Sequence, residues 1–475
     1  MKQFFLFVLL SLVGLSVSAQ IKRSNFWPIG LYVALDFSSG SPTVVSSLNQ
    51  CTEAASSISD TLGNLLFYSD GVNVFNSTHA IMPNGANIGG CASSSQGALI
   101  VPMPQSPNLY YLFLNTCYEY SFSQGARYAI IDMSLNSGLG DVVAPSQLIA
   151  NGYAEEMAAT YHSNNCDVWI VFHERTTANY MAYLLTDTGL TTQPVVSAAG
   201  PSYLPIDNTY SRSMLKFNRA GTMAAQTARS GTGPQVHHFD RSTGIFTPFL
   251  SMPNRPQFDD PYAACFSPND SLLYVEMRYY SPNTWSYILQ YDLTFPTGQQ
   301  ASDSSIVVAI RQQSPEFGQM QLGPDGKIYF AQYNHSTLGA ITNPNVKGMG
   351  CSPTFGAVTL TGGQSMYGMP NFPSQFIGVG PNVGCTQPVA VEVPESRELS
   401  VYPNPTSGWV TFDFEALEGV AYSLQVLDMM GRTVMLKAQI AAPFRIDLGD
   451  LAGGIYAYIL RADDVVKGKG KLRIE

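Results

Sequence analysis

The middle of the chain repeats one pattern of polar and hydrophobic positions, in which a polar turn leads directly into a short strand of aromatic and aliphatic residues. The turns hold Pro, Asn, Asp or Gly, which favour or tolerate turn conformations, and the runs that follow have the length of buried strands. The turns lie at residues 60–64, 106–108, 164–167, 218–221, 267–270 and 323–326. Each turn is expected to reverse the chain between two central strands of one sheet.

The spacing of these turns indicates the architecture. Equivalent positions recur roughly every 50 residues, which is the length of a four-stranded propeller blade, and the strand pattern excludes repeats built from helices. Residues 20–380 therefore predict an all-β propeller of six or seven blades, within the usual four to eight. We favour seven, with residues 31–37 completing a blade together with strands from the C-terminal end of the domain.

The start of the chain has the pattern of a signal peptide. Lys2 precedes an apolar run that begins at Phe4, and small residues end the segment at Ala19. Residues 1–19 are therefore predicted to be removed during export. The apolar run is shorter than the roughly 20 residues that cross a bilayer, and no later stretch qualifies. We expect no transmembrane segment in the mature protein.

The end of the chain predicts a second, smaller domain. A linker rich in Pro and Val occupies residues 381–397, and residues 398–475 follow it. Inward alternation at Val410, Phe412 and Phe414, together with two later strands and glycine-containing turns, predicts a small antiparallel β-sandwich.

Composition narrows the function classes. The formal net charge of -10, with no cluster of Lys and Arg outside the tail, argues against nucleic-acid binding. Seven Cys residues in an exported chain allow up to three disulfides, and we expect one between Cys351 and Cys385, which flank the end of the main domain. The sequence has no C-x-x-C pair, H-E-x-x-H helix, G-x-S-x-G turn or phosphate loop, so neither a metal nor a cofactor is predicted.

Four residues are candidates for ligand binding. His173 and Glu174 directly follow an apolar strand, where a propeller presents its loops. The alternative for His173 is a strand-end histidine bonded to neighbouring backbone. Tyr280 and Trp285 belong to the densest aromatic cluster outside the repeated strands, and a Pro-Asn turn lies between them. Aromatic faces stack on sugar rings or apolar side chains, but they also fill blade cores.

Paired carboxylates raise the possibility of catalysis. Glu155-Glu156 and Asp259-Asp260 are pairs of the kind that a glycosidase needs, one as acid and one as nucleophile or base. Adjacent residues on a strand point to opposite faces, so a dyad would require one carboxylate from each pair. The same divergence, and the lack of a third ligand, argues against a metal site at His237-His238.

The C-terminal domain resembles the sorting domain of the bacterial type IX secretion system. The motifs that carry the resemblance are a Y-P-N-P segment, a D-x-x-G-R turn, a G-I-Y strand and a basic final strand. Their residues are Tyr402, Pro403, Asn404, Pro405, Gly408, Asp428, Gly431, Arg432, Gly454, Ile455, Tyr456, Lys467 and Lys471. The resemblance implies export through the periplasm and across the outer membrane, with the secretion machinery and its sorting peptidase as partners and a secreted or surface location.

The main domain is similar to a family of propeller proteins that are often joined to this sorting domain. Segments at 57–71, 82–85, 94–96, 169–174 and 368–372 carry the similarity. Because that family has little assigned function and a fold does not specify one, three classes stay open. They are a non-catalytic binding or adhesion module for a glycan or protein, a polysaccharide hydrolase or lyase, and a scaffold of a surface assembly. The lack of a recognisable catalytic set favours the first.

Overall fold

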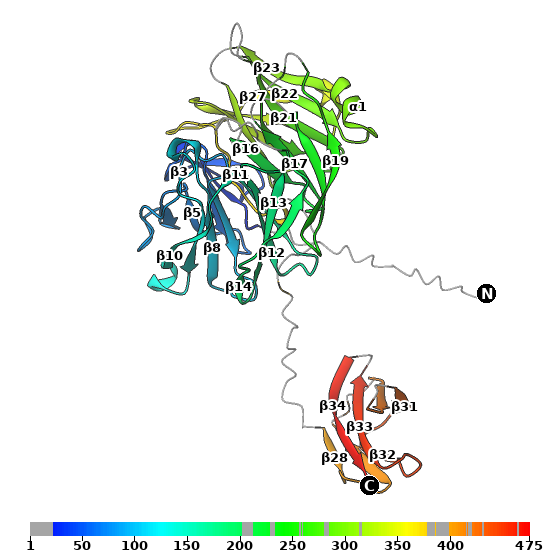
Figure 1. Cartoon of the computed structure of the whole chain (residues 1–475). Coiled ribbons are helices and arrows are strands. Elements are labelled where there is room, and N and C mark those ends of the chain that lie inside the picture. The colour runs from blue at the N-terminus through cyan, green and yellow to red at the C-terminus, as the bar shows by residue number, and fades with distance from the viewer. Residues whose placement is uncertain are drawn as a thin grey trace, which may run out of the picture. The chain divides into compact units, whose positions relative to one another are not determined.

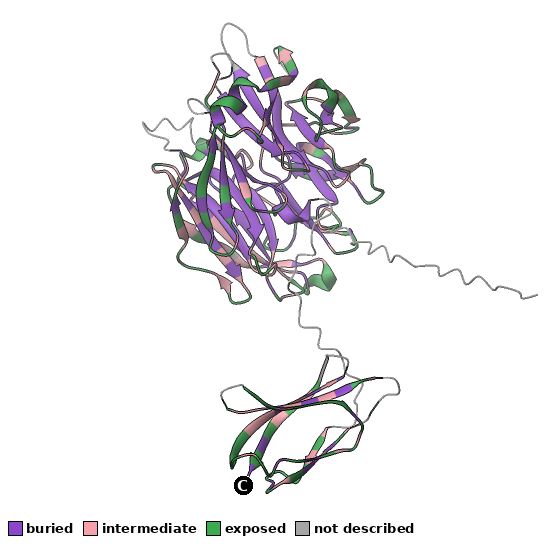
Figure 2. Ribbon diagram, turned by 90° about the vertical axis from the view of Figure 1, so that its right-hand side faces the viewer, coloured by how far each residue is buried: buried purple, intermediate pink, exposed green. Residues whose placement is uncertain are grey.

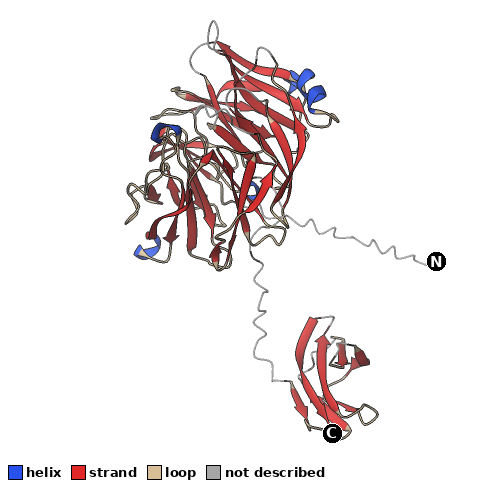
Figure 3. Cartoon of the chain, in the orientation of Figure 1, coloured by secondary structure: helices blue, strands red, loops and turns tan. Residues whose placement is uncertain are grey.

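The computed structural model divides the chain into two compact units, Met1–Cys385 and Thr386–Glu475. The described residues are 22–201, 212–228, 233–255, 258, 260–279, 285–312, 316–377, 385, 399–414, 416, 420–429, 432–462 and 465–475. No helix among them is long and apolar enough to span a membrane. Strands dominate both units, and the helices are single short turns such as α1 (Gly298–Asp303), as Figure 3 shows.

The first unit consists of successive antiparallel sheets built from consecutive strands (Figure 1). The first three sheets hold β1 (Phe26–Ile29), β2 (Leu31–Asp36) and β3 (Thr43–Gln50); β4 (Ser56–Ser59), β5 (Leu65–Ser69) and β6 (Val74–Asn76); and β7 (Ala98–Pro102), β8 (Leu109–Leu114), β9 (Ala126–Asp132) and β10 (Asp141–Ala150). The fourth sheet holds β11 (Tyr153–Tyr161), β12 (Val168–Glu174), β13 (Asn179–Thr186), β14 (Gly189–Leu190) and β15 (Val195–Ala198).

The remaining three sheets of this unit have four strands each. They hold β16 (Ser213–Phe217), β17 (Met223–Ala228), β18 (Gln235–Asp240) and β19 (Ile245–Ser251); β20 (Asp260–Phe266), β21 (Leu272–Tyr279), β22 (Trp285–Asp292) and β23 (Ile306–Gln312); and β24 (Phe317–Leu322), β25 (Ile328–Gln332), β26 (Thr337–Ile341) and β27 (Pro353–Thr359). The described residues of the unit thus form seven sheets, and seven blades stays our prediction.

The sheets are arranged as the blades of a β-propeller. The first strand of each sheet packs against the first strand of the next, in the series β1, β4, β7, β11, β16, β20 and β24. The ring of Trp27 in β1 lies 5.9 Å from that of Tyr329 in β25, which brings the last sheet against the first. Strands β1, β4, β11, β20 and β24 are buried along their whole length, and Figure 2 shows this buried interior.

The repeated polar turns lie where the sequence predicts them. Each joins the first and second strands of one sheet, from the turn between β4 and β5 to the turn between β24 and β25. At Asn218, the side-chain oxygen accepts hydrogen bonds from the backbone N–H groups of Thr222 (2.9 Å) and Met223 (3.0 Å), while Gly221 adopts a φ of +71°. The Asn and Gly of the motif are thus required by the turn itself.

The expected role of residues 31–37 is wrong. Strand β2 lies in the middle of the first sheet, between β1 and β3, and pairs with no C-terminal strand. Gly30, with a φ of +46°, closes a tight connection from β1 to β2, so the two segments pair locally. Among the described residues, one isolated β-bridge, between Leu31 and Gln364, links β2 to the end of the unit.

The disulfides also differ from the expectation. Cys385 is bonded to Cys166 instead of Cys351, and a second disulfide joins Cys91 to Cys117. Cys351 is a buried free thiol in the turn before β27. Cys166 lies in the turn between β11 and β12, 219 residues before Cys385. The positions of the cysteines along the sequence do not reveal that these two meet in the fold.

The second unit is a pair of small antiparallel sheets. One contains β28 (Ser400–Tyr402), β29 (Trp409–Asp413) and β32 (Phe444–Asp447), and the other contains β30 (Tyr422–Leu427), β31 (Thr433–Ile440), β33 (Gly454–Ala462) and β34 (Val465–Ile474). Val410 and Phe412 from the first sheet and Leu424, Val426 and Leu460 from the second belong to one buried core. This agrees with the alternation in the sequence.

Candidate ligand site at one end of the propeller axis

Charged and aromatic side chains gather where the innermost strands of the propeller begin. From the second sheet to the last, the first strands begin at one end of the axis. Strand β1 runs the opposite way, because the N–H of Ser59 at the end of β4 donates to the carbonyl of Arg23 just before β1. Five residues from this end form what we call the axial cluster: Glu53 before β4, Glu155 in β11, Tyr262 in β20, Arg278 in β21 and Gln319 in β24. The amide of Gln319 donates to the carbonyl of Ser95 and to the Tyr262 hydroxyl (3.3 Å), so it connects separate blades.

Glu155 is the buried anchor of this cluster. One carboxylate oxygen accepts hydrogen bonds from the backbone N–H and the hydroxyl of Ser95, both at 2.7 Å, and the other accepts from the backbone N–H of Tyr118 at 2.8 Å. Burial raises the pKa of Glu155, while these three hydrogen bonds oppose the rise. The carboxylate thereby ties together the loops that precede β7 and follow β8.

Glu53 is the second glutamate of the cluster, and the residue as a whole is half-buried. Burial and then the charge of Glu155 raise the pKa of Glu53, whereas a hydrogen bond from Tyr262 and the charge of Arg278 lower it. The two glutamates therefore disfavour each other's ionisation, and together they retain a proton to a higher pH than isolated carboxyls do.

The positive charge of Arg278 is balanced by two carboxylates, and its side chain is held in place by two aromatic rings. Its guanidinium lies 4.8 Å from the ring centroids of both Tyr262 and Tyr367 and forms ion pairs with Glu276 (3.1 Å) and Glu316 (3.4 Å). A cation between two aromatic faces is stabilised by both rings. Arg278 thus stiffens the aromatic wall of the cluster.

Next to the cluster, the short helix Tyr118–Tyr120 exposes two aromatic rings; we call it the rim turn. The exposed fractions are 37% for Tyr118 and 50% for Tyr120, and Glu119 between them is exposed as well. The Cys91–Cys117 disulfide lies directly before this turn. The backbone N–H of Tyr118 is bonded to Glu155, so the rim turn is held by the disulfide on one side and by the axial cluster on the other.

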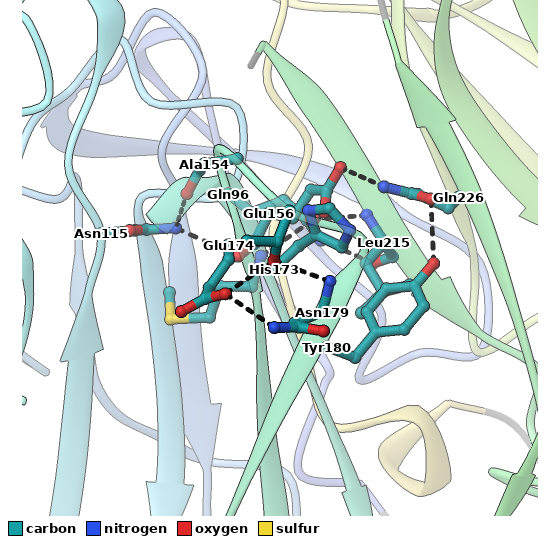
Figure 4. Close-up of polar contacts among 12 residues, drawn as sticks. Gln96, Asn115, Ala154, Glu156, His173, Glu174, Asn179, Tyr180, Leu215 and Gln226 are labelled. Carbon is teal, nitrogen blue, oxygen red and sulfur yellow. Dashed lines mark hydrogen bonds and ion pairs between the residues drawn. The ribbon is translucent and has the colours of Figure 1, made fainter. Parts of the chain in front are cut away.

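His173 does not reach this site. It is fully buried in β12, and its Nδ1 lies 3.8 Å from a carboxylate oxygen of Glu156 (Figure 4). Burial, and then the neighbouring His237, lower the pKa of His173 to about 3. The alternative of an internal histidine is thus the better description, although its neighbours are side chains as well as backbone.

Glu174 has a local role. Its carboxylate accepts hydrogen bonds from the Thr177 hydroxyl (2.6 Å) and the Asn179 amide (2.9 Å), so it closes the turn between β12 and β13 (Figure 4). Trp285 lies half-buried at the start of β22, where its ring stacks on that of Tyr287 at 6.2 Å. Tyr280 lies outside the described residues.

The Glu155-Glu156 pair diverges as the strand geometry predicts. Glu155 faces the axial cluster, whereas Glu156 accepts a hydrogen bond from Gln226 (2.7 Å) on the side of the fifth sheet. Asp260 is buried in β20, and Asp259 lies outside the described residues. The partner of Glu155 in the cluster is Glu53, which no pattern in the sequence distinguished because it stands alone in a loop.

The neighbouring histidines also diverge. His237 is buried, with Nε2 2.7 Å from the carbonyl oxygen of Ala199, and burial lowers its pKa to about 4. His238 is exposed and its ring lies 4.3 Å from that of Phe249. Within the described part of the chain, the one group of three residues with metal-ligand spacing contains Cys91 and Cys117, whose sulfurs are consumed by their disulfide.

The motifs of the C-terminal domain have clear structural roles. Asn404 donates to the carbonyl of Lys471 (2.7 Å) and accepts from the N–H of Arg473 (2.9 Å), which attaches the Y-P-N-P segment to β34. Asp428 accepts from the backbone N–H of Arg432 (3.0 Å) and pairs with its guanidinium (2.7 Å) across the turn. Gly431 lies outside the described residues.

Comparison with known families explains this second unit. Residues 400–475 match the family model described as the secretion system C-terminal sorting domain. The chain is therefore an exported β-propeller protein that carries a type IX sorting tail and is delivered to the cell surface or the extracellular space. A comparison with curated proteins finds no match.

Comparison with solved structures finds other propeller proteins. The periplasmic gluconolactonase PpgL of Pseudomonas aeruginosa is 9% identical over 95% of this chain and 99% of its own, with a TM-score of 0.36. The Dos1 propeller is 10% identical over 74% of this chain and 89% of its own, with a TM-score of 0.39. Likenesses this distant say nothing about activity, so function has to be argued from the site.

Proposed function

We propose that the propeller is a non-catalytic binding and adhesion module that holds a glycan or protein partner at the axial cluster and rim turn. The sorting tail delivers the module to the outside of the cell. The observation that carries the proposal is the rim turn, where the exposed Tyr118 and Tyr120 flank the exposed Glu119.

A glycan is the partner that this chemistry suits first. Tyrosine rings offer a flat apolar face to a sugar ring, and carboxylates accept hydrogen bonds from its hydroxyls. The turn is also held rigid by the Cys91–Cys117 disulfide and by Glu155, so little conformational entropy is lost when a ligand binds.

One observation favours hydrolysis as a second candidate. Glu53 and Glu155 are two carboxyls with raised pKa values at one end of the propeller axis. A proton retained on Glu53 would suit a general acid. Glu155, however, uses both oxygens to hold protein groups, which leaves it poorly placed to act on water or on a sugar.

Affinity electrophoresis of the exported chain against a panel of polysaccharides tests the proposal, with an assay of the same mixtures for new reducing ends. Retardation that is lost in Tyr118→Ala and Tyr120→Ala, without new reducing ends, supports glycan binding at the rim turn. Phe249→Ala removes a similarly exposed ring from the outer strand β19 and serves as the control. New reducing ends that disappear in Glu53→Gln would support hydrolysis instead.

A further inference from the structure

The segment from Gln364 to Ile377 runs through the ring of blades without forming a strand of the last sheet; we call it the axial segment. After β27 ends at Thr359, the chain turns at exposed residues 361 and 362, and residues 368–377 are all buried. A run of ten buried residues outside regular strands requires that its polar groups find partners within the protein.

At its first half, the axial segment builds the floor of the axial cluster. The N–H groups of Tyr367 and Gly368 donate to the carbonyl of Thr52 at 2.9 and 3.0 Å, and the N–H of Met369 donates to Gln319 at 2.9 Å. A Cβ at Gly368 would lie 2.1 Å from the carbonyl oxygen of Glu53, so only glycine permits this approach.

The middle of the axial segment binds two blades at once. Asn371 donates its backbone N–H to Ala55 (2.8 Å), accepts from the Ser56 hydroxyl at its carbonyl (2.8 Å) and donates its side-chain amide to Met157 (2.8 Å). The ring of Phe372 lies 6.2 Å from that of Trp27 in β1.

The second half reaches the other ends of the innermost strands. The amide of Gln375 donates to the Thr160 hydroxyl (2.7 Å), and its oxygen accepts from the N–H of Tyr161 (3.1 Å) at the end of β11. The Ser24 hydroxyl donates to the carbonyl of Phe376 (2.7 Å). The segment therefore contacts the first, second, fourth and last sheets along the axis.

These contacts compensate for a missing link in the ring. Among the described residues, the first and last sheets share no strand, although a shared strand is an obvious way to fasten the two ends of such a ring. The axial segment pairs with the first sheet through Leu31 and with the last through His335. Cys385 then follows eight residues after Ile377 and is bonded to Cys166, in the turn directly beyond Tyr161.

We propose that the axial segment is a plug that closes the ring of blades and completes the axial cluster, and that the Cys166–Cys385 disulfide keeps the plug inserted. The ring is then completed only when the last residues before the sorting tail have entered the axis. The proposal concerns the architecture and stands whether or not the axial cluster binds a glycan.

The proposal can be tested by cutting the folded chain between the last blade and the plug. A protease recognition sequence is inserted between Thr361 and Gly362, where Gly362 is exposed and a Cβ would meet nothing within 4 Å. The matched control is the same insertion between Ser137 and Gly138, an equally open turn between β9 and β10. Each folded chain is cleaved, with and without Cys385→Ser, and examined in a series of urea concentrations by native mass spectrometry and hydrogen exchange.

We expect the cleaved chain with the disulfide to keep its C-terminal piece and its exchange protection. With Cys385→Ser, the piece should leave at a lower urea concentration, and amides of β1–β3, β24–β27 and the loop at Glu53 should then exchange at least ten times faster. The control insertion should change neither property. Unchanged protection after the piece has left would overturn the closing role, and release at the same urea concentration with and without the disulfide would overturn its retaining role.

Discussion

Two buried histidines predict how the stability of the propeller depends on pH. His173 is fully buried and burial lowers its pKa to about 3, while His237 is buried with a pKa of about 4. In the unfolded chain both would titrate near the ordinary value of about 6.5. Replacement of His173 by Gln removes one of these groups and keeps a polar side chain of similar length.

The sign and size follow from proton linkage. A group whose pKa is lowered by folding contributes its full stability above the unfolded pKa and loses it as the pH falls toward the folded pKa. Below about pH 6.5, His173 binds a proton in the unfolded chain but not in the folded chain. The free energy of unfolding therefore falls by about 1.4 kcal/mol per pH unit. Between pH 6.5 and 4.5 the wild type should lose about 2 to 3 kcal/mol through this residue alone.

Urea unfolding at several pH values measures the effect. The difference in unfolding free energy between pH 6.5 and 4.5 should be smaller in His173→Gln than in the wild type by about 2 to 3 kcal/mol. His238→Gln, at the exposed neighbour of His237, is the control and should leave the difference unchanged. If His173→Gln instead increases the sensitivity to acid, then His173 is protonated and paired with Glu156, and the reasoning is refuted.

Three further changes have definite expected outcomes. Non-reducing peptide mapping should recover Cys91–Cys117 and Cys166–Cys385 peptides with Cys351 alkylated only after denaturation; a Cys351–Cys385 peptide would contradict the structure. Asp428→Ala removes the exposed clamp on Arg432 at a cost of less than about 1 kcal/mol in stability, yet it should reduce the amount of protein outside the cell because the turn belongs to the sorting domain; normal secretion in a fractionation assay would argue against this. Phe172→Ala opens a cavity at a fully buried ring that stacks on Tyr153 at 5.1 Å. This substitution should lower the free energy of unfolding by about 3 to 5 kcal/mol. Phe249→Ala, at an exposed ring, is the control and should change it by less than about 1 kcal/mol.

Much of the fold could be predicted because its signals are local. The turns at Asn218 and at residues 267–270 can be recognised from their Asn, Pro and Gly residues. The spacing between such turns indicates the length of one blade. The first sheet was missed as a unit because its first turn, at residues 30–32, lacks the polar motif. The sorting domain was found because motifs such as Asp428 and Arg432 are fixed to one another across a single turn.

The candidate site was harder to predict because it depends on contacts between distant blades. Glu53 and Glu155 belong to different blades, and although Glu155 stands in a Glu-Glu pair, nothing in the sequence links it to Glu53. The axial segment had a signal at residues 368–372, but its role required its partners Ala55 and Met157, which are far from it in sequence. His173 was placed correctly at the end of a strand, yet the sequence does not show which blade covers that strand.

Binding at the axial end is the central claim, and affinity electrophoresis of the exported chain on polysaccharides, with wild type, Tyr118→Ala and Phe249→Ala run side by side, tests it most directly. The account predicts that at least one polysaccharide retards the wild type and Phe249→Ala but not Tyr118→Ala, and that no new reducing ends are formed. Equal retardation of all three proteins would place binding away from the rim turn and contradict the claim. If no polysaccharide retards any of them, the glycan proposal fails, and cross-linking on intact cells would then decide between a protein partner and a scaffold.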